Sequence, residues 1–442
     1  MLLDFKAVNY KSFRDELKFS MIPAPKQKGL DYSVLEAKIG RKKYNALSTA
    51  VIYGPNAAGK TNIIGAMDTF RRIVLRGHIR NDGDESYVNT AANRLELIPN
   101  NLSETRTPVA FSVRFIEKNL CVEYGFTVDL GFFLEDDYPR KIHEERLTVN
   151  DEMIFSRNDE LEIGSLNVIQ NMLIRSFKQN ESSIISVAQN NLNDEELFLL
   201  NGFKAMFSAE LVGLITHWLE RKFLIIYRAD KMQFDPKLTD CEGGPVYISE
   251  GLNEALVDFG ISSNALGYLV QGDDKKEELV SLLRNSEKNT AISAHVFESY
   301  GTVRFANIFP SIIHAIRSGA VLVVDELDAS LHPTAIMSII GLFHNNDINV
   351  HHAQLIFNTH NPIFLNANLF RRDEIHFVER DDAHVSSHYK LSDFGTAGSS
   401  GVRKGEDYMK NYFVERYGAI NAVDFAPIFE KLMKGDSEVQ QP

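Results

Sequence analysis

Residues 49–62, TAVIYGPNAAGKTN, carry the strongest indication of the fold. It begins with a short apolar run rich in β-branched residues, which predicts a buried strand over residues 49–53. The segment that follows, NIIGAMDTFRRIVLRGHI, places Ile63, Met67, Phe70 and Val74 at helical spacing. The sequence therefore predicts a strand, a glycine-containing loop and a helix in that order.

The loop GPNAAGKT, residues 54–61, matches the pattern G-x-x-x-x-G-K-[ST] without deviation. Between a strand and a helix this pattern is typical of a loop that binds nucleotide phosphates, because its glycines let successive backbone N–H groups point at phosphate oxygens. We expect Lys60 to reach the β- and γ-phosphates of ATP and the Thr61 hydroxyl to bind Mg²⁺. The predicted nucleotide-binding residues are Gly54, Pro55, Asn56, Ala57, Ala58, Gly59, Lys60, Thr61 and Asn62.

An acidic motif, VLVVDELD, follows much later in the chain at residues 321–328. Its four apolar residues predict a buried strand that ends in two adjacent carboxylates. We expect Asp325 to hold Mg²⁺ together with Thr61, and Glu326 to activate the attacking water as a general base. Since the two motifs are so far apart, we expect two halves of one ATPase to fold together around an insert.

The residues VLVVDELDASLHP, followed by LIFNTHNP, resemble the ABC-type ATPase heads of the SMC/RecF/OLD group. Within it the chain looks most similar to the ATPases of bacterial anti-phage defence pairs, of the PARIS AriA-like, RloA-like and Septu PtuA-like types. The resemblance implies a D-loop at residues 327–331 with Asp328 at its centre. It also implies that His360 is the switch histidine, which contacts the γ-phosphate and acts in catalysis beside Glu326.

The resemblance also implies a signature motif, for which residues 298–302, ESYGT, are the candidate. Ser299, Gly301 and the start of the next helix would then bind a phosphate. The residues alone equally allow an ordinary helix cap, because Ser is favoured at that position for backbone reasons. No glutamine is assigned to the Q-loop of the family.

The expected fold is α/β: an ABC-type P-loop ATPase head with a mixed or parallel sheet, an antiparallel β-layer and a helical insertion. The expected parts are an N-terminal ATPase lobe with the Walker A loop and the β-layer over residues 1–158, a mainly helical insertion and connector over 159–290, and a C-terminal ATPase lobe over 291–442. Within the insertion, turn residues predict the connector over 236–260, and KKEELVSLLRNSE, residues 275–287, is expected to be a helix.

Composition limits the classes of function. The chain has 442 residues, a formal net charge of −13 and two cysteines, neither in a CxxC pair. A surface that coats nucleic acid is therefore disfavoured, since such binding depends on Lys and Arg. No apolar run approaches the roughly 18 residues of a membrane span. We expect a cytoplasmic protein with no membrane contact.

In the resembling family the signature motif completes the nucleotide site of a second head. The resemblance therefore implies a homodimer that sandwiches ATP and Mg²⁺, with a higher oligomer left open. It further implies an ATP-hydrolysing sensor or scaffold of a defence system, which holds or releases a separate nuclease or toxin encoded nearby. No nuclease is expected in the few residues after Phe425, and DNA or a phage-derived molecule is left open as the trigger.

The alternative is a RecF-like DNA-binding ATPase in DNA repair or maintenance. It rests on two basic clusters, residues 41–43 and the arginines Arg71, Arg72, Arg76 and Arg80, which could equally form a solvated surface. A transporter-associated ATPase is a third and weaker hypothesis, because the β-layer and the C-terminal segment do not match those of such ATPases.

Overall fold

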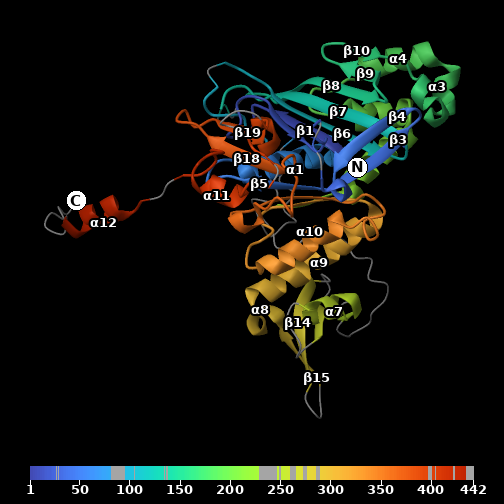
Figure 1. Cartoon of the computed structure of the whole chain (residues 1–442). Coiled ribbons are helices and arrows are strands. Elements are labelled where there is room, and N and C mark those ends of the chain that lie inside the picture. The colour runs from blue at the N-terminus through green and yellow to red at the C-terminus, as the bar shows by residue number, and fades with distance from the viewer. Residues whose placement is uncertain are drawn as a thin grey trace, which may run out of the picture.

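Helix α1 (Lys60–Arg76) lies between two sheets and organises the head, as Figure 1 shows. The computed structural model describes the whole chain except residues 26, 28, 81–94, 104, 134, 136–137, 228–245, 248–249, 259–264, 272–275, 285–288, 397–400, 404, 422–423 and 435–442. One face of α1 contacts the antiparallel layer, where Phe70 packs against Phe5, Phe111 and Phe126. The opposite side of the same apolar core includes Ile52 and Ile356 of the other sheet.

That other sheet is central and has six strands in the order β11-β16-β17-β5-β18-β19. All neighbours are parallel except β19, which is antiparallel to β18. The strands are β11 (Phe223–Ile226), β16 (Val321–Val324), β17 (Gln354–Asn358), β5 (Thr49–Tyr53), β18 (Ile375–Arg380) and β19 (Ser386–Lys390). Their apolar runs are continuous because helices cover both faces of a parallel sheet. The face away from α1 is covered by α9 (Tyr300–Ser318) and α10 (Pro333–His344).

The antiparallel layer has seven strands in the order β10-β9-β8-β7-β6-β1-β2. They are β10 (Leu161–Ile163), β9 (Glu152–Arg157), β8 (Lys141–Val149), β7 (Leu120–Asp129), β6 (Val109–Glu117), β1 (Leu2–Val8) and β2 (Leu17–Ser20). A separate hairpin pairs β3 (Val34–Ile39) with β4 (Lys42–Leu47). The expected α/β head with a mixed, largely parallel sheet and an antiparallel β-layer is confirmed.

Helical turns fill the region after β10. They are η2 (Asn167–Met172), α3 (Arg175–Gln179), α4 (Glu181–Asn190), η3 (Leu199–Phe203), α5 (Lys204–Met206), α6 (Ala209–His217) and η4 (Trp218–Lys222). Trp218 is fully buried and stacks on Phe115 of the antiparallel layer, with ring centroids 3.8 Å apart. The helical insertion is thereby packed onto the head.

Two segments within residues 159–290 differ from the sequence expectation. Phe223–Ile226 does not continue the preceding helix but forms the edge strand β11, paired in parallel with β16. The helix expected over residues 275–287 is wrong, because β14 (Lys276–Arg284) is a strand between two antiparallel neighbours. Lys, Glu and Leu favour helix locally, and pairing in a sheet overrides that preference.

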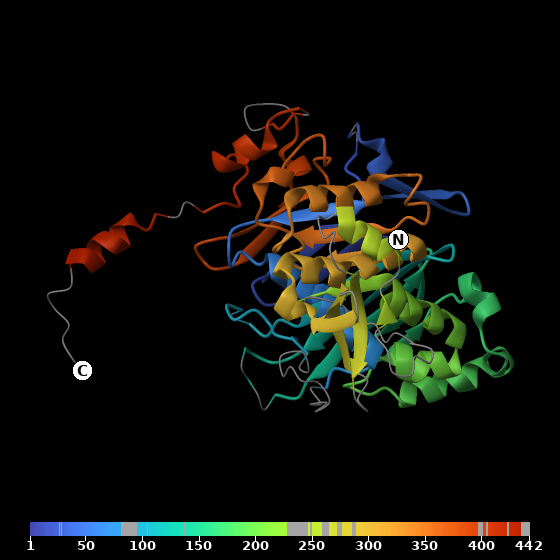
Figure 2. The same cartoon turned by 90° about the horizontal axis from the view of Figure 1, so that it is seen from below.

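Strand β14 belongs to a small sheet with β12 (Val246–Tyr247), β13 (Ala265–Gln271) and β15 (Asn289–Ser293), in the order β12-β13-β14-β15. This sheet lies beyond α9, with α7 (Glu250–Asp258) and α8 (Ala294–Phe297) beside it (Figures 1 and 2). The turn residues predicted for the connector, Pro236, Gly243, Gly244 and Pro245, lie outside the described residues.

The remaining elements are short, except for the last helix. They are η1 (Asp31–Ser33), η5 (Pro362–Phe364), η6 (Leu391–Phe394), α11 (Tyr408–Phe413) and α12 (Ala426–Lys434). Helix α12 stands apart from the body in both views (Figures 1 and 2). Within the described part of the chain, none of the helices has the length and apolar character that crossing a membrane requires.

Candidate nucleotide-binding site

The loop between β5 and α1 is held in a fixed shape by close backbone packing. A side chain at Gly54 would lie 2.3 Å from the carbonyl oxygen of Val378, so only glycine fits there. Gly59 has a φ of 114° and caps α1, and a side chain there would meet the hydroxyls of Ser12 and Ser386. Both features leave the N-terminus of α1 open to an anion, with its first N–H groups unpaired within the helix.

Ser12, in the turn after β1, and Ser386, in strand β19, contact this loop. Ser386 donates to the carbonyl oxygen of Ala58 at 2.6 Å, and Asn62 donates to Ser12 at 2.8 Å. Ala57 has a φ of 63°, an uncommon conformation for a residue with a side chain. The predicted residues 54–62 therefore form one cradle. Ser12 and Ser386 could not be predicted, because no motif contains them.

Lys60 lies inside this cradle. Only 5% of the residue is exposed. Its Nζ donates to the carbonyl oxygen of Gly54 at 2.7 Å and to that of Pro55 at 3.0 Å. Burial lowers the pKa of the ammonium to about 8, although the carboxylates of Glu326 and Asp325 favour its charged form. Lys60 is thus a partly desolvated cation at the N-terminus of a helix, where a phosphate would bind.

Strands β5, β16 and β17 bring the two motifs together. Asp325 directly follows β16, and its Oδ1 accepts from the Thr61 hydroxyl at 3.2 Å. The same oxygen accepts from the side-chain amide of Asn358, the last residue of β17, at 2.6 Å. Since Mg²⁺ takes a few hard oxygen ligands from the protein and others from substrate phosphates and water, this hydroxyl and carboxylate suit Mg²⁺ bound with a nucleotide.

Glu326 continues from Asp325 in a left-handed backbone conformation, with a φ of 52°. Its N–H donates to Oδ1 of Asn358, and its carbonyl oxygen accepts from Arg304 of α9 at 2.6 Å. Arg304 also donates to the carbonyl oxygen of Asp325 at 3.2 Å. Asn358 and Arg304 were missed by the sequence analysis. The position of Asn358, two residues before His360, is the only local signal that could have pointed to it.

The residues after β17 face the predicted D-loop and the phosphate loop. Thr359 donates to Oδ2 of Asp328 at 2.7 Å. His360 is exposed, and its pKa is lowered by partial desolvation and by the positive charge of Lys60, against the opposing effect of Asp328. At neutral pH its imidazole is therefore predominantly neutral, which leaves one ring nitrogen as a donor and the other as an acceptor.

The candidate signature residues lie at the start of α9. Ser299 caps the helix, because its hydroxyl oxygen accepts from the N–H of Thr302 at 3.1 Å. Gly301 packs so closely on the D-loop that a side chain there would lie 2.4 Å from the carbonyl oxygen of Ser330. The helix-cap interpretation of Ser299 is thus correct, and the stretch also contacts the D-loop of its own chain.

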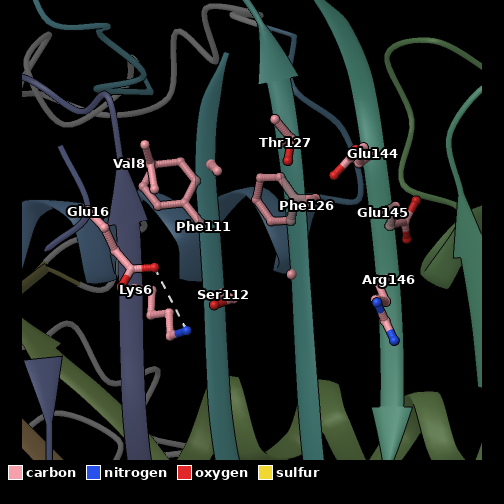
Figure 3. Close-up of a pocket in the computed structure, with 12 residues that line it drawn as sticks. Lys6, Val8, Glu16, Phe111, Ser112, Phe126, Thr127, Glu144, Glu145 and Arg146 are labelled. Atoms are coloured by element: carbon pink, nitrogen blue, oxygen red, sulfur yellow. Dashed lines mark ion pairs between the residues drawn. The ribbon is translucent and has the colours of Figure 1, made fainter. Parts of the chain in front are cut away.

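One pocket of about 280 Å³ lies elsewhere, on the antiparallel layer (Figure 3). Small residues such as Ala110 and Gly125 line it, and Lys6 and Glu16 face each other across one side at 3.8 Å. None of the predicted nucleotide-binding residues lines this pocket. Its lining residues lie in or next to strands and none of them begins a helix, so the cradle of the phosphate loop is the candidate site for a nucleotide.

Comparison with known proteins agrees with this geometry. Residues 50–366, well over half of the chain, match the family model described as "AAA domain, putative AbiEii toxin, Type IV TA system". The matched region includes the phosphate-loop residues from Gly54, the Asp325–Glu326 pair and His360. No curated protein matches the chain. The chain therefore belongs to this family of AAA-domain P-loop ATPases, whose description links it to abortive-infection and toxin–antitoxin systems.

Proposed function

We propose that the protein is the ATP-binding and ATP-hydrolysing subunit of a bacterial anti-phage defence system. The observation that carries this proposal is the contact between Thr61 of the phosphate loop and Asp325 of the acidic pair, at 3.2 Å, in a chain of the abortive-infection ATPase family. Residues separated by most of the chain meet at the N-terminus of α1, where a helix favours an anion.

Each of the site residues has a separate role in the proposed hydrolysis of ATP. Lys60 and the backbone N–H groups of the loop residues other than Pro55 would bind the phosphates, and Thr61 and Asp325 would hold Mg²⁺. When bound, Mg²⁺ neutralises charge that develops on the phosphate oxygens. Glu326 accepts a proton from the attacking water as general base. His360 donates a hydrogen bond to the γ-phosphate through its neutral imidazole.

A second copy of the chain is proposed to complete each site. Ser299 caps α9 and Gly301 lies in its first turn, and the N-terminal N–H groups of this helix can donate to a phosphate of the nucleotide held by a facing copy. Because Gly301 packs on Ser330, the signature stretch and the D-loop would move as one surface. Two chains related by two-fold symmetry would then enclose two ATP molecules, and hydrolysis would release them.

The output of this switch is proposed to be a separate nuclease or toxin, held or released by the ATPase as in the PARIS, RloA-like and Septu pairs that the sequence resembles. This part rests on family resemblance. The RecF-like alternative is less favoured, because two arginines of the cluster after the phosphate loop already have partners within the chain. Arg71 donates to the carbonyl oxygen of Leu219, and Arg72 pairs with Asp68.

The experiment is to express the chain with its native flanking genes and to determine what copurifies. A neighbouring gene product bound in a defined ratio, whose toxicity or nuclease activity changes with ATP, would support the proposal. Steeply salt-dependent binding of the isolated chain to DNA, with no copurifying protein, would favour the RecF-like function instead.

A further inference from the structure

Asn358 is placed where it can control both residues of the acidic pair. Strand β17 lies between β5, which leads into the phosphate loop, and β16, which ends at Asp325. Asn358 is the last residue of β17 and is 1% exposed. Its side chain therefore lies between the two motifs, at the edge where the carboxyl ends of the parallel strands meet.

Both the nitrogen and the oxygen of the Asn358 side-chain amide form hydrogen bonds with the acidic pair. Its Nδ2 donates to Oδ1 of Asp325 at 2.6 Å, and its Oδ1 accepts from the N–H of Glu326. One planar group thus fixes the side chain of the first residue and the backbone of the second. A buried amide with both ends satisfied in this way is rigid, because any rotation would break one of the two hydrogen bonds.

The backbone of Glu326 needs such a restraint. Its φ of 52° is uncommon for a residue with a side chain and persists only where the surroundings impose it. Oδ1 of Asn358 accepts a hydrogen bond from the N–H of Glu326, and the guanidinium of Arg304 donates to the carbonyl oxygen of Glu326 at 2.6 Å. The direction of the Glu326 side chain follows from the conformation that these two contacts fix.

We propose that Asn358 is a positioning residue for ATP hydrolysis, which orients Asp325 toward Mg²⁺ and sets the backbone from which Glu326 reaches the attacking water. The inference rests on the proposed ATPase function of this site. It assigns Asn358 no contact with the nucleotide. Its effect is exerted through the two carboxylates, as partners of metal ligands and catalytic bases usually act.

The test replaces Asn358 by Leu, which has nearly the same shape and neither hydrogen bond, and by Asp, which keeps an acceptor and loses the donor. Each variant should lower kcat about 10–100-fold. The affinity for ATP measured in EDTA should stay within about twofold of the wild type. The concentration of Mg²⁺ that gives half-maximal activity should rise about tenfold in the Leu variant.

Asn349→Leu is the matched control. Asn349 is also buried, at 3% exposure, and its amide makes three hydrogen bonds, to Phe343 and to both backbone groups of Ala353. It lies in the same crossover between β16 and β17 but away from the acidic pair. Its loss should lower stability and leave kcat and the Mg²⁺ requirement of the folded protein unchanged.

The outcomes separate this inference from the proposed function. If both Asn358 variants keep kcat and the Mg²⁺ requirement within twofold of the wild type, Asn358 has no positioning role. A positioning role is also contradicted if Asn349→Leu lowers kcat and raises the Mg²⁺ requirement as much as the Asn358 variants do. If the wild-type chain hydrolyses no ATP, the proposed function fails. In that case the ratio of ATP affinity in Mg²⁺ to that in EDTA still tests whether Asn358 orients Asp325, since Asn358→Leu should lower it.

Discussion

Raising the pH from 7 to 9 should weaken ATP binding about tenfold. The reason is the pKa of Lys60, which burial lowers to about 8 in the protein without nucleotide. ATP phosphates beside Lys60 favour its charged form and raise this pKa on binding. Binding therefore takes up a proton whenever Lys60 is neutral beforehand, and the affinity falls as the pH rises through 8.

The size of the effect follows from the fraction of protein with a charged Lys60. For a pKa of about 8 this fraction is about 0.9 at pH 7 and about 0.1 at pH 9, and the affinity changes in proportion if the bound lysine stays protonated. Calorimetry in buffers of different ionisation enthalpy measures the same linkage. It should show uptake of about 0.1 proton per ATP at pH 7 and about 0.9 at pH 9.

Two variants control this measurement. Lys60→Arg keeps a permanent positive charge and should bind ATP with an affinity that is independent of pH over this range. Lys390 has the same lowered pKa of about 8 but lies on β19, where it donates to the carbonyl oxygen of Ser20. Lys390→Arg should therefore keep the wild-type pH profile. A wild-type affinity that stays constant from pH 7 to 9, without proton uptake, would show that ATP binding does not depend on the protonation of Lys60.

Three further predictions concern binding and stability. Lys60→Ala should abolish ATP binding, and micromolar affinity in a titration would contradict the assignment. Burial lowers the pKa of His376 and brings that of His388 to about 3, so the unfolded chain takes up protons first as the pH falls below 6.5. His388 should therefore cost about 2 kcal/mol of stability between pH 7 and 5 in denaturant titrations. His388→Asn should remove that loss, and a loss of the same size in this variant would contradict the prediction. Trp218→Ala should cost about 3–5 kcal/mol. Trp218→Phe should cost less than about 1.5 kcal/mol, because the buried indole N–H has no hydrogen-bond partner within the described residues, and an equal loss in both would contradict this.

The site motifs were predictable because their chemistry dictates both residue type and spacing. A loop that presents backbone N–H groups to phosphate needs Gly54 and Gly59, and the structure gives a steric reason for each. The pair Asp325–Glu326 was recognisable as carboxylates that end an apolar strand. Asp325 contacts Thr61, far away in the sequence, because both follow parallel strands of one sheet. The apolar runs in the sequence indicated those strands.

Residues that act only through packing and long-range hydrogen bonds could not be predicted. Asn358 and Arg304 reach the acidic pair from two different elements. Asn358 lies in the stretch LIFNTHNP, but the stretch assigns it no role, and Arg304 lies outside the motifs. The prediction of a helix over β14 was wrong for a related reason. The residues of β14 favour a helix locally, and only pairing with β13 and β15 makes them a strand. Tertiary contacts decide such cases, and a single sequence does not contain them explicitly.

We propose that ATP joins two heads and that hydrolysis, with Glu326 as general base, releases them. The mass of Glu326→Gln in solution tests both steps. The variant keeps Lys60 and Thr61 and so should bind Mg-ATP, but it lacks the general base. Native mass spectrometry should show twice the protomer mass of 50.0 kDa, or a higher even multiple, only with Mg-ATP. Lys60→Ala should show no such change. An unchanged mass of Glu326→Gln with saturating Mg-ATP, or hydrolysis at the wild-type rate, would contradict the account.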